Sequence, residues 1–148
     1  MTDKPKILLD LNIILDVFQK RDDFYSDSAK VLELAEIGVV QGFICAHSVT
    51  TLFYILNKSN SVSEAKANIT SLFQFISITN VDQSTIEQAL NLDYPDFEDA
   101  VQMVSAVQNR LDYLITRNPK NFLPSLIPVV QPVEFLAWYK SSKSIRST

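Results

Sequence analysis

The chain has 148 residues, of which 47% are hydrophobic and 20% are charged, and this composition suits one globular domain rather than a disordered chain. Only 2 glycines are present, which argues against a glycine-rich phosphate loop. The single cysteine excludes an intrachain disulfide and a thiolate metal cluster. The net charge is −4, so the chain lacks the global basic field of many nucleic-acid binders, although a local basic patch is enough to bind RNA.

The sequence shows no apolar run of the kind that directs secretion or membrane insertion. The start, Met1-Thr2-Asp3-Lys4-Pro5-Lys6, is not followed by a long apolar run and does not resemble a signal peptide. No uncharged apolar stretch is long enough to span a bilayer. One cysteine fits a reducing environment. We therefore expect a cytoplasmic protein without membrane contact.

Short apolar runs alternate with stretches of helical periodicity along the chain. The expected strands cover residues 7–9, 42–46, 75–78, 113–115 and 129–130. The expected helices cover residues 13–19, 24–37, 49–57, 64–73, 83–90, 97–110 and 132–138, and their expected starts are Asn12, Ser48, Ser63, Asp82, Asp96 and Pro132, with Gly38 as a stop. This alternation predicts a single α/β domain over residues 1–140 with a mainly parallel central sheet, followed by a frayed polar tail over residues 141–148.

Asp10 directly follows the first predicted strand. In a parallel sheet the carboxyl ends of the strands face the ligand crevice, which would make Asp10 a functional residue. The alternative is an Asp that forms a turn by bonding its own backbone, which is common in proteins. The residue alone favours neither reading over the other.

Asp96, Glu98 and Asp99 lie at the start of the sixth predicted helix. Asp96 fits the role of an N-cap, since acids there meet free N–H groups and the positive end of the helix dipole. A cap needs only one carboxylate, and neighbouring acids repel each other unless a positive charge lies between them. Asp99 shares a helix face with Met103, Ala106 and Val107, so we expect it to point inward, where a metal ion would offset its burial.

The fourth predicted strand ends at Thr116-Arg117-Asn118. Asn118 offers an amide oxygen at another strand end, although Asn before proline is also typical of a plain turn. Arg117 and Lys120 are suited to contact phosphate, while exposed cations are more often simply solvated.

Three further polar residues have ambiguous roles. His47 is the only histidine, and it is interpreted as structural because no second ligand lies at a zinc-like spacing. Cys45, on an apolar strand, is interpreted as a core residue. Asp16 is expected to hold a cation or an arginine near the site, or to be solvated on the helix surface.

Taken together, these segments resemble the PIN domain, a small metal-dependent nuclease fold that includes VapC-type toxins. The matching segments are Leu8-Leu9-Asp10-Leu11-Asn12 with Leu15-Asp16, Ala46-His47-Ser48-Val49-Thr50, Asp96-Phe97-Glu98-Asp99-Ala100, and Tyr113-Leu114-Ile115-Thr116-Arg117-Asn118 with Phe122. Residues 132–136 also resemble the last helix of the family. The resemblance covers nearly the whole chain and implies a three-layer α/β/α fold with acids at the carboxyl edge of the sheet.

The resemblance also implies roles for the site residues. Asp10 and Asp99 match acids of the family and are expected to bind Mg²⁺ or Mn²⁺, with Asn118 completing the coordination or bonding a metal-bound water. Asp96 or Glu98 is expected to orient the attacking water. The remaining expectations are that Arg117 and Lys120 bind RNA phosphates and that Asn12, Asp16, Ser48 and Thr116 support the metal-binding residues. The implied partners are an RNA substrate, an antitoxin and a second copy of the chain in a homodimer.

The sequence departs from the family pattern at two positions. The third helix often carries a Glu, but Thr51-Leu52-Phe53-Tyr54 has no acid. An Asp often follows the Thr at the end of the fourth strand, but Asn118 stands there. These departures leave open an alternative function, in which the domain binds RNA or a protein without cleaving. A haloacid-dehalogenase-like phosphatase is disfavoured because Asn12 occupies the position of its second Asp.

Overall fold

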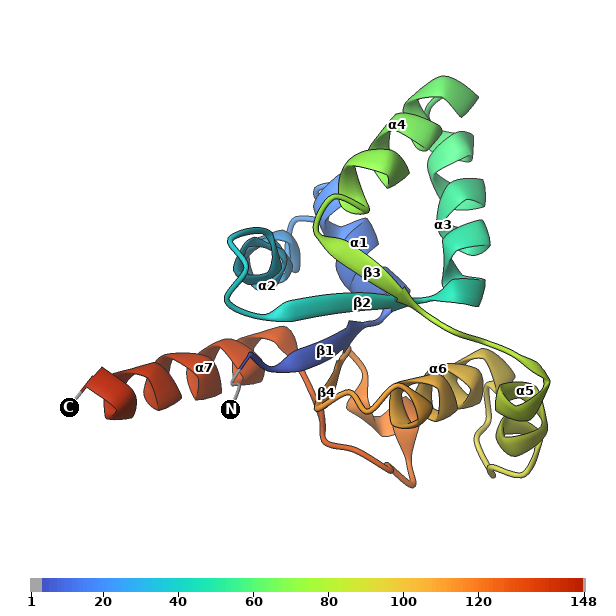
Figure 1. The fold of residues 1–148 in the computed structure, drawn as a ribbon. Helices are drawn as coiled ribbons and strands as arrows, with labels where there is room; N and C mark the ends of the chain where they lie inside the picture. Colours follow the sequence, from blue (N-terminus) through green and yellow to red (C-terminus); the bar gives the residue numbers. More distant parts are fainter. Residues whose placement is uncertain (1–3, 148) are drawn as a thin grey trace.

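The computed structural model describes residues 4–147, which form a three-layer α/β/α domain (Figure 1). The strands are β1 (Lys6–Leu9), β2 (Gln41–Cys45), β3 (Ile76–Thr79), β4 (Tyr113–Ile115) and β5 (Val129–Val130). The helices are α1 (Leu11–Phe18), α2 (Tyr25–Glu36), α3 (Ala46–Ser59), α4 (Val62–Leu72), α5 (Gln83–Leu90), α6 (Phe97–Gln108), the 3₁₀ helix η1 (Pro119–Phe122) and α7 (Pro132–Ser147). The predicted fold class is therefore confirmed.

The sheet has the strand order β3-β2-β1-β4-β5, and every neighbouring pair of strands in it is parallel. Strand β1 lies at the centre, between β2 and β4. Because β1 and β4 are paired with Leu9 opposite Ile115, the residues that follow each strand emerge side by side at the carboxyl edge. This register places the segment after β1 next to the segment after β4.

The side chains of the central strands alternate between two hydrophobic cores. Leu9 and Ile115 belong to the core on one face, which also holds buried residues of α1, α2, α3, α4 and α7. Leu8 and Leu114 belong to the core on the other face, together with residues of α6. Figure 1 shows α1 to α4 on one side of the sheet and α5 and α6 on the other. The unbroken apolar character of the strands follows from burial on both faces.

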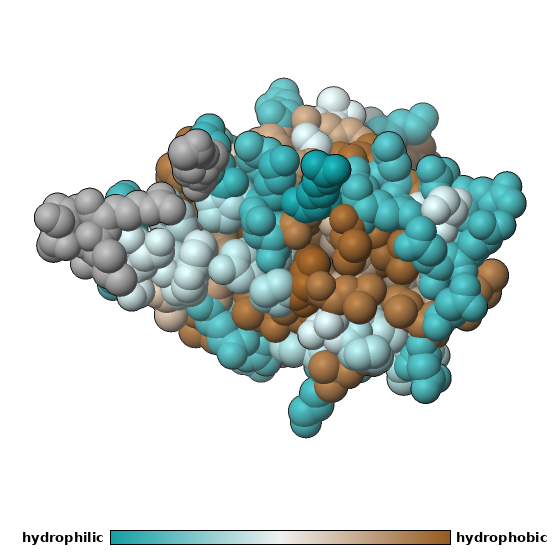
Figure 2. All heavy atoms as spheres, turned by 60° about the horizontal axis from the view of Figure 1, so that its bottom comes forward, coloured by the Kyte–Doolittle hydropathy of each residue, from teal (hydrophilic) through white to brown (hydrophobic). Residues whose placement is uncertain are grey.

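The outer surface formed by α5, α6 and the segment between β4 and β5 is partly apolar. Figure 2, which turns this lower face toward the reader, shows hydrophobic side chains across its centre. Exposed large apolar residues on these elements are Leu90, Phe97, Val107, Leu123 and Leu126. Within residues 4–147 no helix is long and apolar enough to cross a membrane.

Several predicted helix starts are wrong because the helices begin earlier than their sequence signals. Asp10, not Asn12, is the N-cap of α1. Ser48 lies inside α3, which begins directly after β2 at Ala46. The cap of α4 is Ser61 rather than Ser63, and its hydroxyl accepts a hydrogen bond from the Glu64 N–H at 3.1 Å. The predicted caps Asp82 and Asp96 are confirmed.

The last helix is longer than predicted. Helix α7 begins at Pro132 as expected but continues through Ser147 rather than ending near Trp138. A frayed tail was expected over residues 141–148, but the backbone of this segment is helical through Ser147. Thr148 lies outside the described residues. Phe135 anchors α7 in the core, and its ring contacts the rings of Tyr113 and Trp138.

Candidate active site

Asp10 and Thr116 meet at the carboxyl edge of the sheet. The backbone N–H of Asp10 donates to the carbonyl of Ile115 at 3.0 Å, which extends the pairing of β1 and β4 past the last strand residues. The Thr116 hydroxyl then donates to Oδ2 of Asp10 at 2.8 Å. Both side chains are largely buried, so the hydrogen bond satisfies two polar groups with little access to water.

Asp10 has a second side-chain partner on the facing helix. Nε2 of Gln102, on α6, donates to Oδ1 of Asp10 at 3.3 Å. Burial raises the pKa of the Asp10 carboxyl, while the hydrogen bonds from Thr116 and Gln102 and the charge of Arg117 oppose this rise. Asp10 is therefore an oriented, buried carboxyl group at the carboxyl edge of the sheet.

Asp96 caps α6, and this confirms the simpler reading of that residue. Its Oδ1 accepts hydrogen bonds from the backbone N–H groups of Glu98 at 2.8 Å and Asp99 at 3.4 Å. The cap fixes the first turn of the helix. As a result, Asp96 and Asp99 lie together at one end of α6, on the wall of the same hollow.

Asp99 has a strongly perturbed carboxyl group. Its pKa is raised from 3.8 to about 7, first by burial and then by the negative charges of Asp96, Asp10 and Glu98. Asp99 was expected to point inward, and it is half-buried. Met103 and Ala106, on the same face of the helix, are fully buried. Val107, which was expected on the inward face, is 38% exposed.

The acids border a hollow of about 340 Å³ that is lined by Pro95, Asp96, Asp99 and Asn121. Asn121 was not predicted as a site residue. It lies three positions after Asn118 in η1, where its N–H donates to the Asn118 carbonyl at 3.0 Å. The 3₁₀ turn that Pro119 begins brings Asn121 to the hollow, and Asn118 is exposed at its start.

Gln102 was also missed. It lies three residues after Asp99 on α6, at a spacing that places both side chains on one side of the helix. It is 4% exposed, and its Oε1 has no hydrogen-bond partner among the described residues. No local sequence signal marks Gln102, because its partner Asp10 is 92 positions away in the sequence.

His47 lies closer to the acids than its structural interpretation suggested. Its Nε2 is 4.0 Å from Oε2 of the exposed Glu98, and its Nδ1 is 3.1 Å from the Cys45 sulfur. Burial lowers the pKa of His47, although the charges of Glu98 and Asp96 oppose this. Cys45 is buried in the core as predicted, and burial raises the pKa of its thiol.

Asp16 holds arginines, which is one of the two roles predicted for it, and it is fully buried rather than solvated. Its Oδ2 accepts a 2.9 Å hydrogen bond from Ser28 and lies 3.4 Å from Nε of Arg117. Its Oδ1 lies 3.5 Å from Nη1 of Arg21. The arginine contacts are ion pairs without hydrogen-bond alignment, so Oδ1 is buried without a hydrogen bond. Arg21 also donates to Oδ1 of Asn12 at 3.1 Å.

The other predicted site residues have fewer contacts. Ser48 is buried on α3, and the Asn118 N–H donates to the Thr116 hydroxyl oxygen at 3.1 Å. Lys120 is exposed on η1. Arg117 is held by Asp16 and by the ring of Phe24, which lies 3.9 Å from its guanidinium carbon. Its contacts thus indicate a structural role, and phosphate binding by Arg117 and Lys120 stays a prediction.

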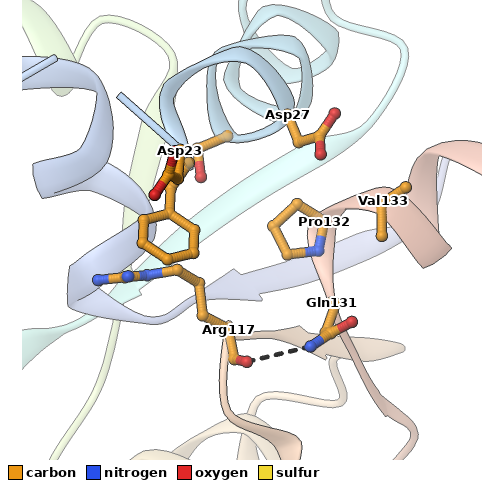
Figure 3. Close-up of a pocket in the computed structure, with 8 residues that line it drawn as sticks. Asp23, Asp27, Arg117, Gln131, Pro132 and Val133 are labelled. Atoms are coloured by element: carbon orange, nitrogen blue, oxygen red, sulfur yellow. Dashed lines mark hydrogen bonds between the residues drawn. The ribbon is translucent and has the colours of Figure 1, made fainter. Parts of the chain in front are cut away.

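A second hollow, of about 220 Å³, is lined by Arg117 (Figure 3). It is bordered by Asp23 and Asp27 near the start of α2 and by Pro132 and Val133 at the start of α7. Figure 3 shows the Arg117 carbonyl bonded to the Gln131 side chain, whose Nε2 donates at 3.2 Å. This bond ties the segment after β4 to the segment after β5.

The donor set at the acid site fits a divalent cation that keeps part of its water. Among the described residues, no three His, Cys, Asp or Glu side chains converge closely enough to hold a metal ion by themselves. The negative charge of Asp10 contributes to the raised pKa of Asp99, and a bound cation would relieve this repulsion. Mg²⁺ commonly binds through one or two carboxylates and completes its shell with water and substrate phosphate.

Comparison with known proteins places this geometry in a family. The PIN domain profile matches residues 6–120, which includes all the acids described above. The chain belongs to the PIN domain family. Among curated protein sequences, none matches this chain.

Solved structures similar in fold to this PIN domain include proteins described as toxins. A toxin–antitoxin complex from Klebsiella pneumoniae has a TM-score of 0.66 and 26% identity, covering 85% of this chain and 97% of that one. VapBC2 from Rickettsia felis, bound to a promoter DNA fragment, has a TM-score of 0.64 and 16% identity, covering 85% and 98%. VapC20 of Mycobacterium tuberculosis has a TM-score of 0.58 and 14% identity, covering 73% and 86%.

Proposed function

We propose that this PIN domain is a metal-dependent endoribonuclease that acts as the toxin of a toxin–antitoxin pair. The observation that carries the proposal is the raised pKa of Asp99, because burial and the nearby charges of Asp96, Asp10 and Glu98 make a second negative charge costly there. Strongly perturbed carboxyls in a hollow are typical of catalytic sites. A bound cation would offset the repulsion among these carboxylates and would therefore stabilise the folded protein.

Asp10 and Asp99 are the residues that would hold Mg²⁺ or Mn²⁺. When bound, the metal ion supplies Lewis-acid polarisation of the scissile phosphate and an acidified water as nucleophile. Thr116 and Gln102 fix both oxygens of Asp10 from opposite sides, so this carboxylate is oriented before substrate arrives. Asn121 borders the same hollow and offers an amide to a bound water or phosphate oxygen.

Glu98 is the acid best suited to orient the attacking water. Oδ1 of Asp96 already accepts two backbone N–H groups of α6, so this oxygen is committed to the helix cap. Glu98 is exposed at the same end of the helix and lies 4.0 Å from His47. A carboxylate next to an imidazole is suited to accept and pass on a proton.

The similar structures support the choice of RNA as substrate and of an antitoxin as partner. VapC20 is described as a toxin that cleaves the sarcin-ricin loop, and the Klebsiella pneumoniae protein is part of a toxin–antitoxin complex. Exposed Lys120 lies on η1, next to the hollow that Asn121 lines, where it could contact a flanking phosphate. The early helices expose apolar side chains, including Tyr25 and Tyr54, which supports the expectation of a homodimer.

Cleavage of a mixed RNA pool tests the nuclease proposal. Wild-type protein is incubated with Mn²⁺, with Mg²⁺ and with EDTA, and the variants are Asp10→Asn and the matched control Asp93→Asn, an exposed acid between α5 and α6. We expect metal-dependent cleavage that Asp93→Asn keeps and Asp10→Asn loses. A folded Asp10→Asn protein that still cleaves would overturn the assignment of Asp10.

One observation favours a second candidate function, a PIN domain that binds RNA without cleaving it. Helix α3 carries no acid at Thr51-Leu52-Phe53-Tyr54, and Asn118 follows the fourth strand where the family often has an Asp. This function predicts RNA binding that is unaffected by EDTA and no cleavage under any metal condition. The assay above therefore separates the two functions.

A further inference from the structure

Asp16 is the most deeply buried charged residue near the site, yet it does not line the acid hollow. It lies on α1, six residues after Asp10, and ion pairs join it to Arg21 and Arg117. We propose that Asp16 is a positioning residue that fixes the Asp10–Thr116 hydrogen bond through these two arginines. The proposal deepens the proposed nuclease function and rests on it for its catalytic consequence.

The first link runs through Arg117. Its side chain is held between Oδ2 of Asp16, 3.4 Å from Nε, and the ring of Phe24. Its carbonyl accepts a hydrogen bond from Gln131, as Figure 3 shows. Arg117 is therefore restrained at both its side chain and its backbone, immediately after Thr116.

This restraint acts on the Thr116 hydroxyl. Thr116 stands between Ile115, which is fixed in β4, and Arg117, which Asp16 holds. Its hydroxyl oxygen accepts from the Asn118 N–H at 3.1 Å and donates to Asp10 at 2.8 Å. Releasing Arg117 would free the turn that carries the Asn118 N–H, and the hydroxyl would lose the contact that sets its rotamer.

The second link runs through Arg21 to the other flank of Asp10. Nη1 of Arg21 lies 3.5 Å from Oδ1 of Asp16 and donates to Oδ1 of Asn12 at 3.1 Å. Asn12 lies one turn before Asp16 on α1, in the first turn after Asp10. Asp16 thus attracts Arg21, which holds the side chain of Asn12 two residues after Asp10, and Arg117, which directly follows Thr116.

The chemistry of the cluster explains why a carboxylate is needed at residue 16. Two guanidinium groups converge on one buried side chain, and the Ser28 hydroxyl donates to the same group from α2. An anion that is taken out of water is retained only where it is paired. An amide of the same shape would leave both arginines without a counter-charge, and their side chains would turn toward solvent.

The test compares Asp16→Asn with Leu56→Ala, a buried substitution on α3 that lowers stability without touching the cluster. Hydrogen exchange of the Asn118 amide, which bonds the Thr116 hydroxyl, reports on positioning without metal or RNA. We expect this amide to exchange about tenfold faster in Asp16→Asn, with little change at the Ala100 amide in α6. Mn²⁺ affinity and kcat for RNA should each fall about tenfold, with KM nearly unchanged.

A purely structural role for Asp16 gives a different result. Both amides would then accelerate by the same factor, as in Leu56→Ala, and Mn²⁺ affinity of the folded protein would not change, which would overturn the proposal. If Asp16→Asn does not fold, Arg117→Gln removes the same ion pair and must give the same local exchange pattern. If wild-type protein cleaves no RNA, the proposed function fails, and the exchange of Asn118 still decides whether Asp16 positions Thr116.

Discussion

The Thr116 hydroxyl donates a 2.8 Å hydrogen bond to Oδ2 of Asp10, across 106 positions of the sequence. The contact exists because β1 and β4 are parallel neighbours that end at the same edge of the sheet. It holds one oxygen of Asp10, and Gln102 holds the other. The orientation of Asp10 is therefore a property of the sheet and of α6 together.

Replacing Thr116 with Val should weaken the site more than the fold. Val keeps the shape of Thr but cannot donate to Asp10, so we expect a loss of about 1 kcal/mol in the free energy of unfolding. Mn²⁺ affinity and RNA cleavage should fall about tenfold or more, because Asp10 loses the group that orients it. Isothermal titration with Mn²⁺ and chemical denaturation measure the two effects.

Thr85→Val is the matched control for this substitution. Thr85 is also buried, and its hydroxyl donates to Gln108 at 2.6 Å, in a network on α5 and α6 that does not include Asp10. It should cost similar stability and leave Mn²⁺ affinity unchanged. Equal losses of Mn²⁺ affinity in both variants would contradict a specific role for Thr116.

The elements that the sequence predicted well are those with local signals. Asp82 and Thr85 form a reciprocal capping box at the start of α5, and Asp96 caps α6 with its own side chain. Ser63 was preferred over Ser61, although Ser61 with Glu64 three residues later is the capping pattern that the structure uses. Helix α3 follows β2 without a connecting loop, so no cap residue marks its start.

The candidate site was predicted where a family resemblance or a strand end marked it, as at Asp10 and Asp99. Gln102 and Asn121 were missed because their roles depend on which residues face them across the fold. The same holds for Arg117, whose pairing with Asp16 joins residues from opposite ends of the sequence. Such contacts are set by the strand order, which local patterns do not specify.

The contribution of Asp99 to the stability of the protein should fall as the pH rises from about 4 to about 7. In this window the folded state keeps a proton on Asp99, whose pKa is raised from 3.8 to about 7, while the unfolded state has lost it. Folded protein therefore binds more protons, and each rise in pH favours unfolding until Asp99 is charged in both states. Denaturant titrations across this range measure the effect.

Asp99→Asn should remove this dependence. The variant should be more stable than wild type by about 1 kcal/mol near neutral pH, after allowance for solvent screening of a half-buried group, and equal to it at low pH. Glu33→Gln, an exposed acid on α2, serves as the control and should leave the pH profile unchanged. A difference in stability between Asp99→Asn and wild type that does not grow as the pH rises through this window would contradict the raised pKa of Asp99.

Divalent cations should stabilise the wild-type protein in a pH-dependent manner. Mn²⁺ competes with a proton for Asp99, so its affinity should rise as the pH increases through about 7. A thermal shift series with Mn²⁺ at several pH values measures this, and Ca²⁺ tests size selectivity. Asp99→Asn should show a much smaller shift, whereas a shift equal to that of wild type would place the metal elsewhere.

An added carboxylate at residue 121 should strengthen metal binding. Asn121 lines the same hollow as Asp96 and Asp99, so Asn121→Asp adds negative charge where a cation would lie. We expect tighter Mn²⁺ binding by about tenfold and a loss of stability without metal. Asn60→Asp, an exposed change at the end of α3, should change neither quantity. Unchanged Mn²⁺ affinity in Asn121→Asp would show that the hollow is not the metal site.

Cleavage of RNA by wild type and by Asp99→Asn, with Mn²⁺ and with EDTA, is the most direct test of the active site. Asp99→Asn is expected to fold at least as well as wild type near neutral pH, so a loss of cleavage is a loss of chemistry. We expect wild type to cleave only with metal and Asp99→Asn to be inactive under both conditions. Cleavage that persists in EDTA, or in the Asn variant, would contradict a metal-dependent site built on Asp10 and Asp99.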